Sequence, residues 1–135
     1  MKEFIKRIFR KSTLEEFPKV EIELTENWVK HDNGNSLGKK GSEGGKILSD
    51  QENINGVRIT IEANARNIPF AITFGIYGLM FHTEFFSEIE TAIEYFERKK
   101  NEIDIILQMF EIQEDNQDLE WGNKKDEYLE RLISE

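Results

Sequence analysis

The feature that most constrains the fold is an uncharged stretch in the middle of the chain. Residues 67–86 read NIPFAITFGIYGLMFHTEFF, and no Asp, Glu, Lys or Arg occurs from Asn67 to Thr83, although 33% of the chain is charged. A membrane helix needs about 17 to 25 apolar residues, and this stretch sits at the short limit and contains Pro69, two glycines and His82. We therefore expect no membrane span and interpret the stretch as a buried element.

The stretch predicts a β-hairpin if Tyr77 and Gly78 form a two-residue turn, because glycine supplies the positive φ that such turns require. Side chains alternate between the two faces of each strand. In this register one face is apolar and predicts a core: Phe70, Ile72, Phe74, Ile76, Leu79, Phe81, Thr83 and Phe85. The other face is small and polar: Ala71, Thr73, Gly75, Met80, His82 and Glu84. A slip of one residue would reverse the assignment.

Flanking patterns predict the other elements. Apolar residues alternate with polar ones at 20–24, which predicts a strand that could continue to His31, and again at 57–62. Residues 32–46 are rich in glycine and predict a flexible loop. Ser87 and Glu90 form a capping box before apolar residues at helical spacing, which predicts a helix over 87–112 that could break near Asn101. Shorter helices are expected over residues 2–11 and 126–135.

This order of elements predicts one α+β domain over residues 1–135. The expected architecture is an antiparallel sheet of about four strands, with the long helix packed on its apolar face and short helices at both ends. A chain of 135 residues is long enough to bury a core without disulfides.

Composition narrows the classes of function. The chain has no cysteine and no apolar leader at its N-terminus, so we expect a cytoplasmic protein. Its net charge is -9, with +1 over residues 1–83 (12 bases, 11 acids) and -10 over residues 84–135 (6 bases, 16 acids). Such a field repels nucleic-acid phosphates and attracts a basic protein partner. An acidic surface that serves only solubility is the competing interpretation.

Two groups of residues are candidates for a site. If the apolar sides of all strands face the long helix, the opposite face of the sheet carries Glu21, Glu23, Arg58, Thr60, Glu62, Thr73, His82 and Glu84. A second group lies in the acid-rich segment 111–123: Glu114, Asp115, Asp118 and Trp121. Carboxylates near an imidazole could perform acid–base chemistry or hold a metal, aromatic and charged groups could bind a protein, and a solvated face with ion pairs is the simplest alternative.

No sequence motif of hydrolases, metalloenzymes or phosphate-binding loops is present, so we assign no catalytic residue, no metal ligand and no cofactor. The blocks GVRITIE, IPFAITFGIYGLMFHTEFF and SEIETAIEYF, with the dipeptides Phe74-Gly75 and Tyr77-Gly78, resemble small bacterial proteins of the immunity type from polymorphic toxin systems. The resemblance covers about residues 56–100. It implies a non-catalytic cytosolic protein that binds and blocks a cognate toxin, and it identifies no binding residues.

The sequence therefore leaves two hypotheses. The first is an acidic protein-binding module of the immunity type, which uses the polar sheet face and the acidic segment against a basic toxin domain. The alternative is a small-molecule or metal-binding domain, with or without enzymatic activity, around Arg58, Thr73, His82 and Glu84, where Ala71 and Gly75 leave room for a ligand.

Overall fold

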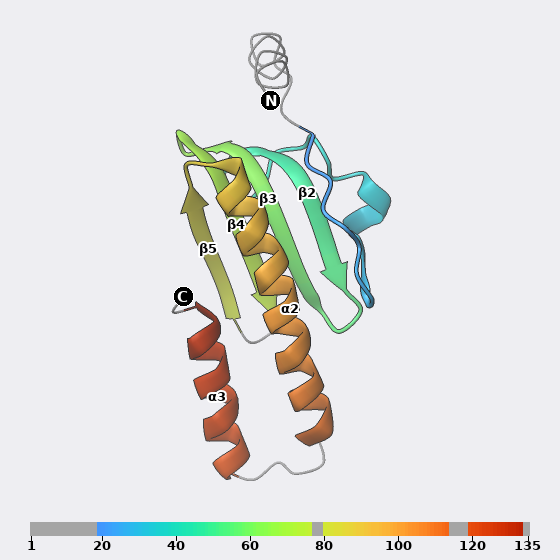
Figure 1. The fold of residues 1–135 in the computed structure, drawn as a ribbon, viewed down its shortest axis with the longest axis vertical. Helices are drawn as coiled ribbons and strands as arrows, with labels where there is room; N and C mark the ends of the chain where they lie inside the picture. The colour runs from blue at the N-terminus through green and yellow to red at the C-terminus, as the bar shows by residue number, and fades with distance from the viewer. Residues whose placement is uncertain (1–18, 77–79, 114–118, 134–135) are drawn as a thin grey trace.

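The computed structural model describes residues 19–76, 80–113 and 119–133 and has an α+β architecture of two layers (Figure 1). The elements of the sheet are β1 (Trp28–Lys30), β2 (Lys46–Asn53), β3 (Val57–Ala65), β4 (Ile68–Ile76) and β5 (Met80–Phe86), with a short 3-10 helix, η1 (His31–Gly34), after β1. The helices are α2 (Ile89–Gln113) and α3 (Leu119–Ile133). The predicted fold class is confirmed, with five strands rather than four.

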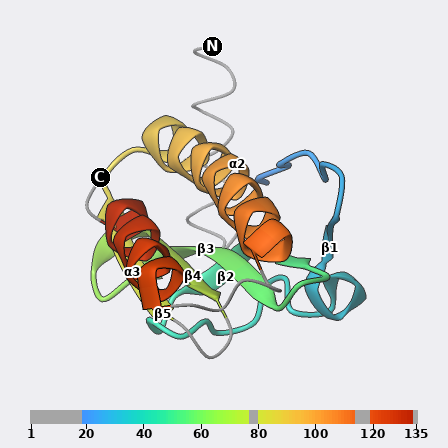
Figure 2. The same ribbon diagram turned by 90° about the horizontal axis from the view of Figure 1, so that it is seen from below.

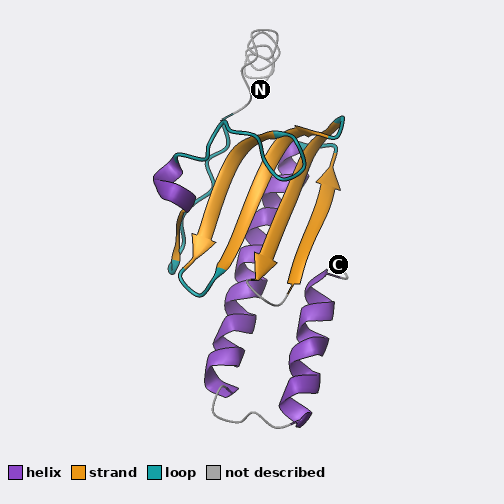
Figure 3. Ribbon diagram, turned by 180° about the vertical axis from the view of Figure 1, so that it is seen from behind, coloured by secondary structure: helices purple, strands orange, loops and turns teal. Residues whose placement is uncertain are grey.

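The sheet is an antiparallel meander in which neighbouring strands follow chain order, β1-β2-β3-β4-β5. The long helix α2 crosses one face of this sheet, and no helix covers the opposite face in the described part of the chain (Figures 2 and 3). We call these the helix-covered face and the open face. The expected N-terminal helix lies outside the described residues.

The core lies between α2 and the helix-covered face. Strand β3 supplies Val57, Ile59 and Ile61, and β4 supplies Ile72, Phe74 and Ile76, all of them buried. Helix α2 meets them with Ala92, Phe96, Ile103 and Ile106, whose spacings of four, seven and three residues place them on one side of the helix. The predicted long helix is confirmed, begins two residues later than Ser87 and is continuous through Asn101.

The alternating segment 20–24 does not form a strand, so this prediction was wrong. Instead it runs irregularly along the helix-covered side of the sheet, where Ile22 joins the core. Gln51 of β2 donates a hydrogen bond to the Ile22 carbonyl at 3.0 Å, and the Lys100 ammonium donates to the Glu23 carbonyl at 2.8 Å. The first strand is β1, and Trp28 within it donates its indole N–H to Asp104 of α2 at 2.8 Å.

The predicted hairpin exists, but its register was wrong by one residue. Strand β4 ends at Ile76, β5 begins at Met80, and these two residues pair with each other, whereas a two-residue turn would pair Ile76 with Leu79. The predicted turn itself, Tyr77 and Gly78, lies outside the described residues. Phe74 consequently pairs with His82, and Ile72 pairs with Glu84. Side chains of β5 therefore face the side opposite to the prediction. Phe86 packs against Tyr95 of α2, with ring centroids 4.9 Å apart, while Phe81 is 68% exposed on the open face.

Helix α3 packs beside α2 and begins at Leu119, inside the acid-rich segment 111–123. Its Leu132 is 2% exposed and belongs to the core, and the Leu132 carbonyl accepts a hydrogen bond from the buried Lys99 ammonium at 2.7 Å. Among the described residues, no helix is long and apolar enough to cross a membrane.

We predict that Leu132→Ala lowers the free energy of unfolding by about 2 to 5 kcal/mol, because it removes a fully buried side chain and leaves a cavity between α3 and the core. The neighbouring Ile133 is 41% exposed and provides the matched control. Ile133→Ala should change the stability by less than about 1 kcal/mol. Urea denaturation of both variants measures the difference, and equal losses would contradict the docking of α3 through Leu132.

Candidate functional site

The centre of the open face is an ion pair between β2 and β3. Arg58 donates from Nε to Asp50 Oδ1 at 2.9 Å and from Nη2 to Oδ2 at 2.6 Å, so the two groups form a bidentate pair. Thr60 Oγ1 donates to the same carboxylate at 3.1 Å. The Asp50 side chain is fully buried, whereas that of Arg58 is 47% exposed, and the hydrogen bond with Asp50 raises the pKa of Arg58. Asp50 thus fixes an exposed guanidinium in place.

A second buried carboxylate, Glu62, lies farther along β3 beneath the glycine-rich segment. This segment is folded against the sheet, and Gly41 and Gly45 bond to each other across its hairpin-like end at 2.8 Å. Glu62 is 0% exposed and accepts hydrogen bonds from the backbone N–H groups of Glu43 and Gly45 at 3.0 to 3.3 Å. A Cβ at Gly41 would overlap the Glu62 carboxyl group. Glu62 therefore anchors the loop and is not available to a partner.

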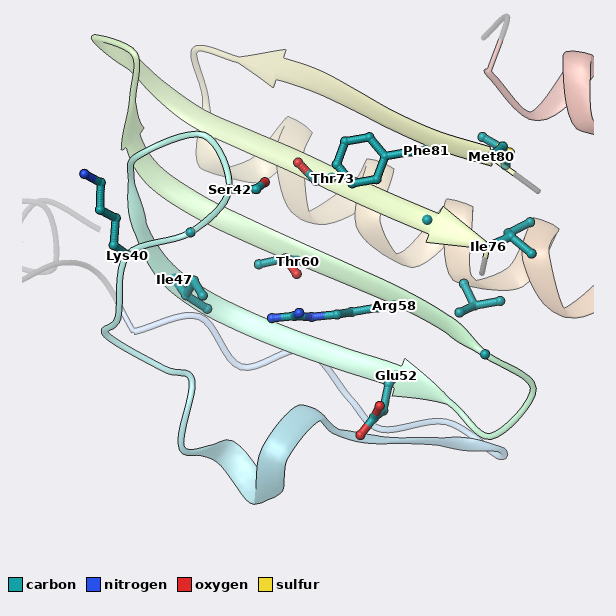
Figure 4. A pocket seen from close by; sticks show the side chains of 14 residues that line it. Lys40, Ser42, Ile47, Glu52, Arg58, Thr60, Thr73, Ile76, Met80 and Phe81 are labelled. Atoms are coloured by element: carbon teal, nitrogen blue, oxygen red, sulfur yellow. The ribbon is translucent and has the colours of Figure 1, made fainter. Parts of the chain in front are cut away.

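Between this loop and the edge of the sheet, the open face is hollowed into a cleft of about 710 Å³ (Figure 4). Arg58, Thr60 and Thr73 lie on its floor, and Phe81 of β5 stands at one side (Figure 4). The remaining lining residues come from the loop and the strand ends: Lys40, Gly41, Ser42, Ile47, Glu52, Gly56, Val57, Gly75, Ile76 and Met80. Thr73 is tied to Thr83 by a hydrogen bond of 3.0 Å between their hydroxyl oxygens.

His82 and Glu84 do not belong to this face, which corrects the predicted polar composite. Both lie on the helix-covered face, because β5 pairs with β4 one residue away from the predicted register. His82 Nε2 is 2.6 Å from Glu84 Oε2, and the His82 ring lies 5.6 Å from that of Phe74. The sheet thus separates this pair from Arg58 and Thr73, and the predicted small-molecule or metal site around all four residues does not form.

Glu21 and Glu23 are also separated from Arg58. They are exposed in the irregular segment on the helix-covered side, since no strand forms there to carry them to the open face. Glu114, Asp115 and Asp118 lie outside the described residues. Trp121 falls within α3.

Sequence reasoning missed an acidic stripe on α2. Glu90, Glu94 and Glu97 are exposed and recur at the spacing that places residues on one side of a helix, opposite Phe96 and Ile103. We call these three residues the acidic stripe. The spacing of these glutamates on the polar side of the predicted helix is the signal in the sequence that could have identified the stripe.

Two of the three basic residues of α2 point inward. The exposed side of the helix therefore carries a larger excess of acidic residues than the helix as a whole. Lys99 is 0% exposed and donates to Glu102 Oε1 at 2.8 Å as well as to α3. Lys100 is 3% exposed, lies 5.5 Å from the centre of the Trp28 ring, and has its pKa lowered by burial. Arg98 is the exposed base of α2 in its described part.

The described residues contain no group of three His, Asp or Glu side chains that could hold a metal ion. His31, the second histidine, lies 3.5 Å from Glu52 near the cleft, on the opposite side of the sheet from His82. The two histidines do not converge.

We predict that Glu62→Gln lowers the free energy of unfolding by about 2 kcal/mol. The amide keeps the shape but cannot accept all the backbone N–H bonds that the buried carboxylate accepts. Glu52→Gln, on the same face and half-buried, is the matched control and should cost less than about 1 kcal/mol. Denaturant unfolding gives the energies, and hydrogen exchange at Glu43 and Gly45 should accelerate only in the Glu62 variant. Unchanged exchange there would contradict the anchoring role.

Comparisons of the chain with protein-family models, with curated proteins and with solved structures found no match.

Proposed function

We propose that this chain is a non-catalytic, acidic protein-binding module that acts in the cytoplasm and binds a basic protein, in the manner of an immunity protein that neutralises a toxin domain. The observation that carries the proposal is the acidic stripe. Three carboxylates point outward along about two turns of α2, and the lysines that would offset them are buried beneath the same helix.

The stripe suits a basic partner for electrostatic reasons. Glu90 and Glu94 lie one helical turn apart, and Glu97 extends the row, so their potentials add over a surface that a rigid helix holds in place. Exposed charges of this kind contribute mainly to the rate of association and to the choice of partner. Arg98, the exposed base of this helix, forms a weak pair with Glu102 at 3.8 Å rather than with a residue of the stripe.

The partner can be found by affinity capture from an extract of the native cells, with the bound proteins released by salt and identified by mass spectrometry. A basic protein released by moderate salt fits the proposal. Neutralisation of that protein's toxicity by this chain then distinguishes an immunity function from simple binding. A captured partner that is acidic, or whose binding does not depend on salt, would contradict it.

We predict that the triple variant Glu90→Lys, Glu94→Lys and Glu97→Lys slows association with the captured partner by at least about tenfold at low salt, because like charges then face each other. The fold should persist, since all three side chains are exposed. Stopped-flow or surface-binding kinetics measure the rate.

The matched control is the triple variant Glu21→Lys, Glu23→Lys and Glu26→Lys. It changes the net charge by the same amount at exposed positions outside α2, and it includes two residues that the sequence had suggested for partner binding. A similar slowing in both variants would mean that net charge alone steers the partner, and the assignment to the stripe would fail.

A second candidate function, the binding of a small molecule, is favoured by the cleft on the open face. The guanidinium of Arg58 is fixed by Asp50 and partly exposed, and apolar side chains stand around it. This combination is typical of sites for small ligands that carry an acidic or polar group on an apolar body. It replaces the alternative that was based on His82 and Glu84.

We predict that, if this second function holds, Phe81→Ala weakens ligand binding at least about fivefold, because Phe81 forms one wall of the cleft. Phe85→Ala is the control: Phe85 lies on the same face of β5 but does not line the cleft. Ligand-observed NMR with a library of metabolites provides the measurement. An absence of any ligand, or equal effects of the two variants, would remove this candidate.

A further inference from the structure

The two edges of the sheet differ in length and exposure. Strand β1, at one edge, has three residues, whereas β5, at the other edge, has seven, from Met80 to Phe86. An edge strand presents backbone N–H and C=O groups on its outer side that can pair with another strand. Helix α3 extends beyond the Met80 end of β5 and does not run along its outer side (Figures 1 and 3).

Strand β5 lacks the features that usually prevent edge pairing. It contains no Lys, Arg or Pro, and its pairing with β4 is continuous, without a bulge. Its one acidic residue, Glu84, is already paired with His82 on the helix-covered face. Two large apolar side chains, Phe81 and Phe85, are 68% and 38% exposed on the open face. This long, apolar edge is suited to accept another strand.

The sequence of β5, MFHTEFF, is complementary to itself when it is reversed about Thr83. An antiparallel copy centred on Thr83 places Phe81 opposite Phe85 of the second copy on the open face. On the helix-covered face it places His82 opposite Glu84 of the second copy, and Met80 opposite Phe86. Each pair occurs twice because of the two-fold symmetry. Aromatic pairs are favourable when they lie directly opposite each other on antiparallel strands, and an imidazole opposite a carboxylate can form a hydrogen bond with it, as His82 and Glu84 do within one strand.

Neighbouring registers lose this complementarity. A shift of one residue would place open-face side chains of one copy opposite helix-side ones of the other, because the two faces alternate along a strand. A two-fold axis at His82 or at Glu84 keeps the faces but opposes two histidines or two carboxylates. Two carboxylates directly opposite each other repel, and two opposed histidines lose the carboxylate that the Thr83 register places across from each imidazole. The register centred on Thr83 is also the one that pairs all seven residues of β5.

We infer that β5 is a self-association edge, at which two copies of the chain pair antiparallel about Thr83 and join their sheets into one. The strand that pairs with this edge is β5 of a second copy, because the polar and apolar residues of β5 are complementary to those of the same strand in the antiparallel direction. The two-fold axis then passes through the sheet from face to face, so α2 of both copies lies on the same side.

A single cysteine tests the register, because the chain has none of its own. In the full chain, Thr83→Cys places two thiols opposite each other on the axis, where Cα atoms of directly opposed residues lie about 4.5 to 5.5 Å apart, within disulfide range. Mild oxidation at low protein concentration should give a covalent dimer. Phe81→Cys, two residues away on the same face, is the matched control. It opposes Phe85 rather than itself, so it should crosslink at least about fivefold less.

A charge-swap series tests the pairing by a second measurement. The wild type should sediment as a dimer. His82→Glu should weaken the dimer at least about tenfold, because it opposes two carboxylates, and the added change Glu84→His should restore the affinity. Thermal unfolding of each variant separates loss of dimer from loss of fold.

Two outcomes would overturn the inference. The first is a wild type that remains monomeric up to about 1 mM, the limit of weak association. A monomer whose β5 amides become protected only when another protein is added would show that the edge receives a partner's strand instead of a second copy. The second outcome is a dimer in which Thr83→Cys crosslinks no better than Phe81→Cys, which would place the interface elsewhere.

Discussion

One helix covers one face of this sheet, and the rest of the structure depends on that constraint. The centre of the covered face is apolar, because β3, β4 and α2 fill it with Ile59, Ile61, Phe74 and Phe96. The open face has no such cover, yet it carries two buried carboxylates. A buried charge is tolerated only when it is paired or fully hydrogen-bonded. The guanidinium of Arg58 donates two hydrogen bonds to Asp50, and backbone amides of the folded loop donate to Glu62. The polar residues of the open face are thus first of all structural.

Buried charges of the helical layer must also be hydrogen-bonded, and this requirement determines which charges remain exposed on α2. Lys99 and Lys100 reach beneath α2 and donate to the carbonyls of Leu132 and Glu23, so they join α3 and the irregular segment 19–25 to the helix. Hydrogen bonds from a charged donor contribute more than neutral ones. Because these ammonium groups are used inside, their charge does not offset the glutamates outside. The acidic stripe, which supports the proposed binding of a basic partner, therefore results from the use of Lys99 and Lys100 to attach α3 and segment 19–25 to α2.

Features set by local pattern could be predicted from the sequence, and features set by distant contacts could not. The periodicity of α2 and the alternation in β3 identify their buried sides without further information. Strand β2 escaped prediction because its core-facing residues include Gln51 and Asn53, whose partners are Ile22 and Asp104, far away in the chain. The register of β5 depends on which residue pairs with Ile76: the structure has Met80 there instead of Leu79, and the sequence pattern permits both pairings. This one-residue difference moved His82 and Glu84 away from Arg58 and removed the predicted composite site.

The proposed self-association and the proposed partner binding use different parts of the molecule and reinforce each other. Pairing through β5 leaves the outward side of α2 uncovered and turns both copies of that helix toward the same side. A basic partner that approaches this side would meet two acidic stripes instead of one, and the potentials of neighbouring like charges add. Two stripes on one rigid sheet also raise the effective concentration of the second when the first is engaged, provided that the partner spans both. Strand β5 would then raise the affinity for the partner by placing two acidic stripes on one side of the dimer, without contacting the partner itself.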